Sequence, residues 1–211
     1  MKLAVIAANG KTGQLIVKEA VDKGLDVTAI VRHTNQTVAQ KTILKDLYDL
    51  TREDLEEFDA VVDAFGVWNP EKLTEHQTSI DHLITILSGS TTKLFVVGGA
   101  GSLYIDPSHT TQLFETPDFP DAYKPVAINM SKGLDRLREA KDVHWVYVSP
   151  AADFQANGAK TGKVAFAGEQ FTTNEKGESY ISYADYAAAM VEELRNPTVD
   201  QARISVYTKE A

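Results

Sequence analysis

Two glycines directly follow an apolar run in the stretch VIAANGKTG, residues 5–13. A pyrophosphate needs free backbone N–H groups, close approach of the backbone and the N-terminus of a helix. Gly10 allows the close approach, and Gly13 lets a following helix pack tightly against the strand, because glycine has no Cβ. The backbone amides offered to the phosphates would be those of Asn9, Lys11 and Thr12. The alternative interpretation is a simple tight turn between a strand and a helix.

A second candidate for nucleotide recognition is Arg32, at the end of the stretch TAIVR. In dinucleotide-binding folds an acidic residue at the end of the second strand binds the ribose 2′-hydroxyl of NAD, whereas an arginine accommodates the 2′-phosphate of NADP. No acidic residue follows Arg32 before Asp46. Arg32 therefore favours NADP as the cofactor, with NAD as the alternative. An exposed arginine without a ligand is the competing interpretation.

Five apolar runs bounded by turn residues predict strands that are buried on both faces, as in a parallel sheet. They are Leu3–Ala8, Val27–Val31, Ala60–Phe65, Leu94–Val97 and Trp145–Val148. Helical patterns lie between them over residues 13–21, 52–58, 80–87 and 123–137. The glycine loop thus joins a strand to a helix, which is the context that a dinucleotide-binding fingerprint requires. We predict a Rossmann-type α/β fold, a doubly wound parallel sheet with helices on both faces.

The whole chain, residues 1–211, is predicted to form a single NAD(P)-binding Rossmann domain. Three segments break the alternation of strands and helices: residues 67–75, 98–122 and 152–180. Each follows a predicted strand, so we expect them to be inserted loops at the carboxyl edge of the sheet. Long loops at this edge usually carry function, and these would form the substrate site.

Composition limits the kinds of partner and chemistry. The net charge of −9 argues against a nucleic-acid partner, and the absence of cysteine removes disulfides and thiolate catalysis. The five histidines show no ligand-like spacing with carboxylates, so no metal site is expected. The first apolar run is too short for a signal peptide or a membrane span. We expect a cytoplasmic protein without membrane association, either a monomer or a homodimer.

Several stretches together resemble the atypical short-chain dehydrogenase/reductases, and among them the NmrA-like group of NAD(P)H-flavin reductases, which is related to biliverdin reductase B. They are AANGKTG, AIVR, LKDLYDLT, DAVVDAFG, VVGGAGSLY, TPDFPDAY, VSPAADF and SYISYADYAAAMVEEL. The residues that this resemblance implies beside the adenine are Asp46 and Leu47. Those implied beside the ribose and pyrophosphate are Ala64, Phe65 and Gly66, and those implied near the nicotinamide are Gly98, Ser149 and Pro150.

The chain departs from the family pattern at the residues that would transfer protons. Tyr123 marks the tyrosine of the superfamily's Tyr-x-x-x-Lys pair, but position 127 is alanine. Lys132 follows Tyr123 by nine residues and would lie on the opposite side of a helix. In addition, Ala7 stands where the family's loop generally begins with glycine, which constrains the first turn. A conventional proton relay is therefore absent.

Without this relay, the resemblance favours direct hydride transfer from NAD(P)H to a planar acceptor such as a flavin or a quinone. Ser102 and Tyr123 are the candidate catalytic residues, with Ser102 as a hydrogen-bond donor to the acceptor or, alternatively, a loop serine. Aromatic residues in the strand-end loops would stack on the acceptor or form the core of a lid: Trp68, Tyr104, Phe114, Phe119 and Phe154. A non-catalytic NADP(H)-sensing regulatory protein is the alternative function. A sugar-nucleotide epimerase is disfavoured, because it relies on the same tyrosine and lysine.

Overall fold

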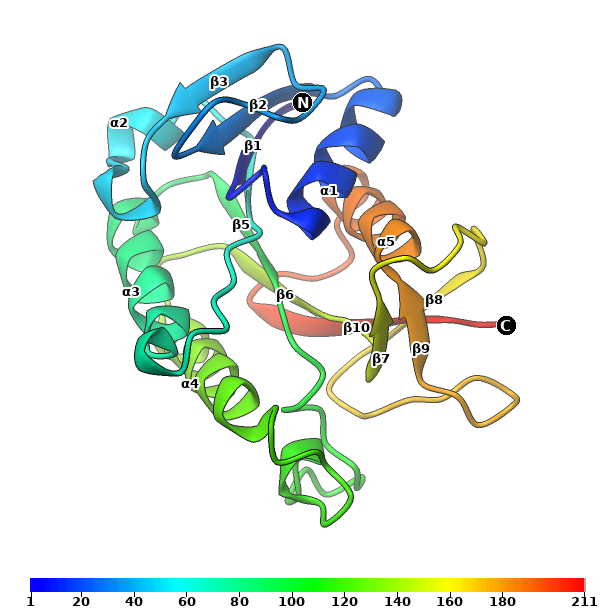
Figure 1. The fold of residues 1–211 in the computed structure, drawn as a ribbon. Coiled ribbons are helices and arrows are strands. Elements are labelled where there is room, and N and C mark those ends of the chain that lie inside the picture. Colours follow the sequence, from blue (N-terminus) through cyan, green and yellow to red (C-terminus); the bar gives the residue numbers. More distant parts are fainter. Residues whose placement is uncertain (211) are drawn as a thin grey trace.

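The structure is a computed structural model and describes residues 1–210. Its main sheet contains β1 (Lys2–Ile6), β2 (Asp26–Val31), β3 (Lys41–Leu44), β4 (Ala60–Asp63), β5 (Lys93–Val97), β6 (Trp145–Ser149), β8 (Val164–Ala167) and β10 (Ala202–Thr208). The strands lie in the order β3-β2-β1-β4-β5-β6-β10-β8 (Figure 1). All neighbours are parallel except β8, which runs antiparallel to β10. A separate parallel pair consists of β7 (Asp153–Gln155) and β9 (Tyr180–Ser182).

Helices cover both faces of this sheet, as a doubly wound fold requires. The helices are α1 (Lys11–Asp22), α2 (Arg52–Leu55), α3 (Glu75–Leu87), α4 (Lys124–Glu139) and α5 (Tyr183–Arg195). Figure 1 shows α1 packed beside α5 on one side of the sheet, and α3 beside α4 on the other. Successive strand residues point to opposite faces, so Phe95 belongs to the core beneath α1 and α5, whereas Leu94 and Val96 belong to the core beneath α3 and α4. The predicted Rossmann-type fold is confirmed.

Two of the strands that the sequence did not predict, β3 and β10, lack a continuous apolar run, whereas β8 is a short run, Val164–Ala167, inside a segment expected to be a loop. β3 is an edge strand whose residues are exposed or half-buried. In β10, the buried apolar residues Ile204 and Val206 alternate with Arg203 and Ser205. Within the segment 152–180, residues 164–167 form β8 and extend the sheet beyond β10, so this part is an edge strand and not a loop.

Three predicted elements are shorter in the structure: β1, α2 and β4, which ends at Asp63 instead of Phe65. β1 stops at Ile6 instead of Ala8, since Ala7 adopts a φ of 55°. Helix α2 spans one turn and ends at Leu55 instead of Phe58. Its N-terminus follows the prediction, because Thr51 and Asp54 form a capping box.

Candidate functional site

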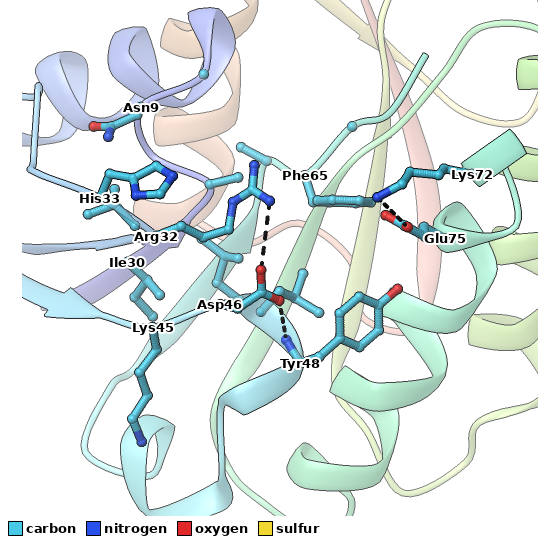
Figure 2. A pocket seen from close by; sticks show the side chains of 17 residues that line it. Asn9, Ile30, Arg32, His33, Lys45, Asp46, Tyr48, Phe65, Lys72 and Glu75 are labelled. Atoms are coloured by element: carbon cyan, nitrogen blue, oxygen red, sulfur yellow. Dashed lines mark hydrogen bonds and ion pairs between the residues drawn. The ribbon is translucent and has the colours of Figure 1, made fainter. Parts of the chain in front are cut away.

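A cavity of about 480 Å³ opens where the strand order reverses between β1 and β4. Residues at and just after the ends of β1, β2, β3 and β4 line it, together with Glu75 at the start of α3 and Lys72 in the short turn before it (Figure 2). The lining segments are Ile6–Gly10 without Ala8, Ile30–His33, Lys45–Tyr48 and Ala64–Gly66, with Lys72 and Glu75. In open α/β sheets, ligands bind in the crevice at this topological switch point.

The glycine loop sets how closely α1 approaches the end of β1. A Cβ on Gly13 would lie 2.8 Å from the carbonyl oxygen of Ala7 and 2.9 Å from both Cα and the carbonyl oxygen of Ala8. No side chain other than hydrogen fits this space. The turn before it is strained, because Ala7 occupies the left-handed region that glycine adopts without cost. The constraint expected from alanine at this position is therefore observed.

The first turn of α1 presents backbone amides that other residues of the described chain leave available. Gly10 is the N-cap and has no side chain to cap the helix. Among residues 1–210, no hydrogen bond joins another group to the amides of Lys11, Thr12 and Gly13. These donors lie at the positive end of the helix dipole, where an anionic phosphate is stabilised. Asn9 has a different role: its side chain donates to Thr34 O (2.9 Å) and accepts from Gln36 N (2.8 Å), which ties the glycine loop to the loop after β2.

Arg32 projects into the cavity with little to hold it. Its side chain is 71% exposed, and Nη1 lies 3.8 Å from Oδ2 of Asp46. Asp46 in turn accepts a hydrogen bond from Tyr48 N (3.0 Å), so its carboxylate is fixed opposite Arg32 (Figure 2). The neighbouring Lys45 is bound by Asp54 at 2.6 Å instead. Arg32 is thus a cation available to an anionic group of a ligand.

A buried carboxylate supports the wall of the cavity at the end of β4. Asp63 is 2% exposed and accepts a hydrogen bond from Phe65 N at 3.0 Å. Burial raises the pKa of Asp63 to about 7, although the Phe65 amide opposes this shift. Asp63, Phe65, His76 and Tyr147 are among the residues that line a second, small cavity of about 10 Å³. Burial lowers the pKa of His76, whose Nε2 is 2.9 Å from Val67 O.

The comparison with known proteins identifies the family of this site. Residues 7–197 match the model of a family described as NAD(P)H-binding. The chain belongs to this NAD(P)H-binding family. The match begins within the glycine loop and continues through α5, so it includes every segment that lines the cavity except Ile6. Family membership supports the predicted nicotinamide cofactor and agrees with the resemblance to the atypical short-chain dehydrogenase/reductases.

Similar proteins of full length are known. The uncharacterized protein YwnB of Bacillus subtilis is 42% identical over 212 residues, covering 99% of each chain. A crystal structure from Streptococcus pneumoniae, named "a putative NADH-flavin reductase", is 53% identical, covers 99% of this chain and 100% of its own, and superposes with a TM-score of 0.97. A structure from Bacteroides thetaiotaomicron, named a "putative epimerase", is 31% identical, covers 100% of this chain and 98% of its own, and has a TM-score of 0.86.

In this member of the NAD(P)H-binding family, the residues expected to bind the cofactor fall into three groups. Those that line the cavity are Asn9, Gly10, Arg32, Asp46, Leu47, Ala64, Phe65 and Gly66. Lys11, Thr12 and Gly13 lie beside it in the first turn of α1. Gly98, Ser149 and Pro150 are buried at the carboxyl ends of β5 and β6 and do not line it. The lining residues that sequence reasoning missed include Lys45 and Tyr48, because they follow the unpredicted strand β3.

The two residues expected to act on the acceptor lie in different surroundings. Ser102 is 3% exposed, lies outside the cavity lining, and its Oγ accepts a hydrogen bond from Arg203 Nη1 at 2.8 Å. Tyr123 is 53% exposed at the start of α4, and its ring centroid lies 6.1 Å from that of Trp68, which is 68% exposed. Other expected stacking residues are engaged within the protein, since Tyr104 stacks on His109 and Phe154 packs against Tyr183.

Membrane-spanning helices and clusters of metal ligands are not found in residues 1–210. No helix of residues 1–210 has both the length and the apolar character needed to cross a membrane. In the same part of the chain, no three histidine, aspartate or glutamate side chains gather as metal ligands would.

Gly13→Val should abolish binding of NAD(P)H. The branched side chain would collide with the backbone of Ala7 and Ala8 and displace the start of α1 from the cavity. Binding is measured by titration calorimetry, with circular dichroism to confirm the fold. Gly168→Ala is the matched control, because a Cβ at Gly168 meets nothing within 4 Å. Wild-type affinity in a folded Gly13→Val variant would contradict the assigned role.

Asp63→Asn should stabilise the protein increasingly as the pH rises. Because the pKa of Asp63 is raised from 3.8 to about 7, the folded state loses stability between these pH values, where only the unfolded state readily releases the proton. Asparagine removes this penalty and keeps an acceptor for Phe65 N. The gain in the free energy of unfolding should be absent below about pH 4 and reach up to roughly 4 kcal/mol above pH 7.

Urea denaturation across this pH range measures the effect of Asp63→Asn. Asp121→Asn is the control, because the side chain of Asp121 is 93% exposed. A difference between Asp63→Asn and wild type that does not change with pH would show that Asp63 titrates as an ordinary carboxyl.

Proposed function

We propose that this protein is an NADPH-dependent reductase that transfers a hydride directly to a flavin, a quinone or a similar planar acceptor. The proposal rests on the glycine loop and the start of α1. The unpaired backbone amides there lie beside the cavity at the topological switch point, and Arg32 lines the same cavity. The similar protein named "a putative NADH-flavin reductase", at 53% identity over nearly the whole chain, supports an acceptor of the flavin class.

The residues around the cavity fit a dinucleotide with an extra phosphate. The amides of Lys11, Thr12 and Gly13 would bind the pyrophosphate at the start of α1. Arg32 would bind the 2′-phosphate, because it is exposed and only weakly paired with Asp46. Asp46 and Leu47 would contact the adenosine, and Ala64–Gly66 would lie beside the ribose and pyrophosphate.

The bound nicotinamide would supply the hydride, and the chain would supply orientation and hydrogen bonds. Tyr123 has no lysine one helical turn further on, since residue 127 is alanine and the adjacent Lys124 pairs with Asp121 at 2.8 Å. A strong general acid is thus lacking at this position, which suits an electron-poor ring better than a ketone. The hydroxyls of Ser102 and Tyr123 are the proposed hydrogen-bond donors to the acceptor.

The acceptor ring would bind on the aromatic pair formed by Trp68 and Tyr123. The two rings come from different segments, one after β4 and one before α4, and both are more than half exposed. Trp68 follows Gly66, which lines the cavity, by two residues. Exposed aromatic rings at the edge of a cofactor cavity offer a flat apolar surface on which a planar acceptor can stack.

Arg32→Ala should weaken the binding of NADPH and leave that of NADH nearly unchanged. Loss of a charge-assisted contact to the 2′-phosphate costs roughly 1.5–3 kcal/mol, which is about one to two orders of magnitude in Kd. Titration of both cofactors measures the effect, and Arg195→Ala serves as the control because Arg195 lies outside the cavity. Equal losses for NADPH and NADH would show that Arg32 has a general structural role.

The reductase assignment is tested by following NADPH absorbance with a panel of flavins, quinones and carbonyl compounds. We expect oxidation with planar acceptors and none with simple carbonyls. Trp68→Ala should raise the KM for the acceptor by roughly three- to tenfold, the value of a lost aromatic contact. Phe166→Ala, another exposed aromatic but on β8, should not change it. Tight NADPH binding without oxidation by any acceptor would instead favour an NADP(H)-sensing protein.

A further inference from the structure

Arg203 is a buried cation that the proposed cofactor site does not use. It lies in β10, and its side chain has 0% exposure. One arm of the guanidinium, Nη1, donates to Ser102 Oγ at 2.8 Å. The other arm, Nη2, donates to the carboxylate and to the backbone carbonyl of Glu169. We call Arg203, Ser102 and Glu169 the Arg203 clamp.

The Arg203 clamp joins three segments that are far apart in the sequence. Ser102 belongs to the loop after β5, Glu169 follows β8, and Arg203 is in β10. Tyr104 strengthens the connection, because its amide donates to Glu169 O at 3.0 Å and its ring lies 5.7 Å from Arg203 Cζ. The loop that carries Ser102 is therefore held against the C-terminal strand by one side chain.

The direction of the hydrogen bond between Arg203 and Ser102 determines whether the Ser102 hydroxyl can donate its proton to another group. A guanidinium has only donors, so the Ser102 oxygen must be the acceptor. The proton of the Ser102 hydroxyl is then free to be donated to another group, and the adjacent positive charge polarises the O–H bond. Because Ser102 is 3% exposed, its surroundings also restrict its rotation.

Net stability alone gives little reason for an arginine here. A buried ion pair is often no more stabilising than apolar side chains of similar volume. Arg203 Nε in addition has no hydrogen-bond partner within the described chain. Arginine has a planar guanidinium that donates to Ser102 and to Glu169 in fixed directions, whereas the single ammonium group of lysine does not hold two acceptors in this way.

We propose that Arg203 is a positioning residue for the reduction: it holds Ser102 as a committed hydrogen-bond donor to the planar acceptor. This inference rests on the proposed function. Glu169 fixes the guanidinium from the other side, and Arg138 Nη2 supports Glu169 at 2.8 Å. Arg138 does not contact Ser102, so it shares the carboxylate of the clamp but not its proposed role.

The test compares Ser102→Ala, Arg203→Lys and the double variant in NADPH oxidation with FMN. Ser102→Ala should lower kcat by about tenfold, the value of one hydrogen bond in the transition state. Arg203→Lys keeps a charge beside Glu169 but loses the fork, so its kcat should fall to a similar level. The double variant should fall no further than Ser102→Ala alone. The Kd of NADPH should be unchanged, because the Arg203 clamp does not line the cofactor cavity.

Arg136→Met is the matched control: Arg136 lies on the same helix as Arg138, 3.8 Å from Asp81 and outside the Arg203 clamp, so kcat should stay within about twofold of wild type, a change smaller than the loss of one hydrogen bond. Arg203→Met provides a second variant that removes every donor, and it should match the kcat of Ser102→Ala.

A wild-type kcat in either folded Arg203 variant, or losses that multiply in the double variant, would overturn the inference while the reductase function stands. If the wild-type protein oxidises NADPH with no acceptor, the proposed function fails, and this inference fails with it.

Discussion

The close contact between the start of α1 and the end of β1 is the constraint on which the site depends. At Gly13 the helix backbone approaches Ala7 and Ala8 so closely that no Cβ fits, and Ala7 bends into a left-handed conformation to allow it. This contact ends β1 early and aims the first amides of α1 past the carboxyl edge of the sheet. The loops after β2 and β4 then complete a cavity around those amides. A displacement of the first turn of α1 would therefore move these amides away from the cavity.

The electrostatics of the cavity differ from those of the whole chain. The protein carries a net charge of −9, yet the cavity contains Arg32, Lys45 and Lys72, with two carboxylates opposite them. Lys45 pairs with Asp54, and Lys72 lies 3.7 Å from Glu75. The side chain of Arg32 is more exposed than those of Lys45 and Lys72. Each of the three cations faces a carboxylate, so charge is balanced at the cavity although the whole chain is acidic, and an anionic ligand meets less repulsion there than a uniformly acidic surface would give.

Local patterns made much of this arrangement predictable. Five strands appear in the sequence as continuous apolar runs because both faces of a doubly wound sheet are buried, and the glycine loop and Arg32 are recognisable from the chemistry that phosphates require. β3 and β10 were not predicted, because edge exposure removes the apolar run from one and the polar residues Arg203 and Ser205 interrupt it in the other. The partner of Ser102 could not be predicted either. Arg203 lies 101 residues away, and no local pattern reports such a pairing.

The residues that line the cavity lie far along the chain from Arg203, which holds the loop of Ser102, and this separation has a consequence for folding. Every residue that lines the cavity lies between Ile6 and Glu75. The loop of Ser102, in contrast, is held by a residue in the last strand of the sheet. Contacts of such long sequence separation form late, because the entropy of closing a long loop must be overcome first. During synthesis, where N-terminal parts emerge first, we expect the segments that line the cavity to emerge well before Arg203 can hold the loop of Ser102. The loop of Ser102 would then lack its contact with Arg203 until β10, the last strand of the sheet, has been made.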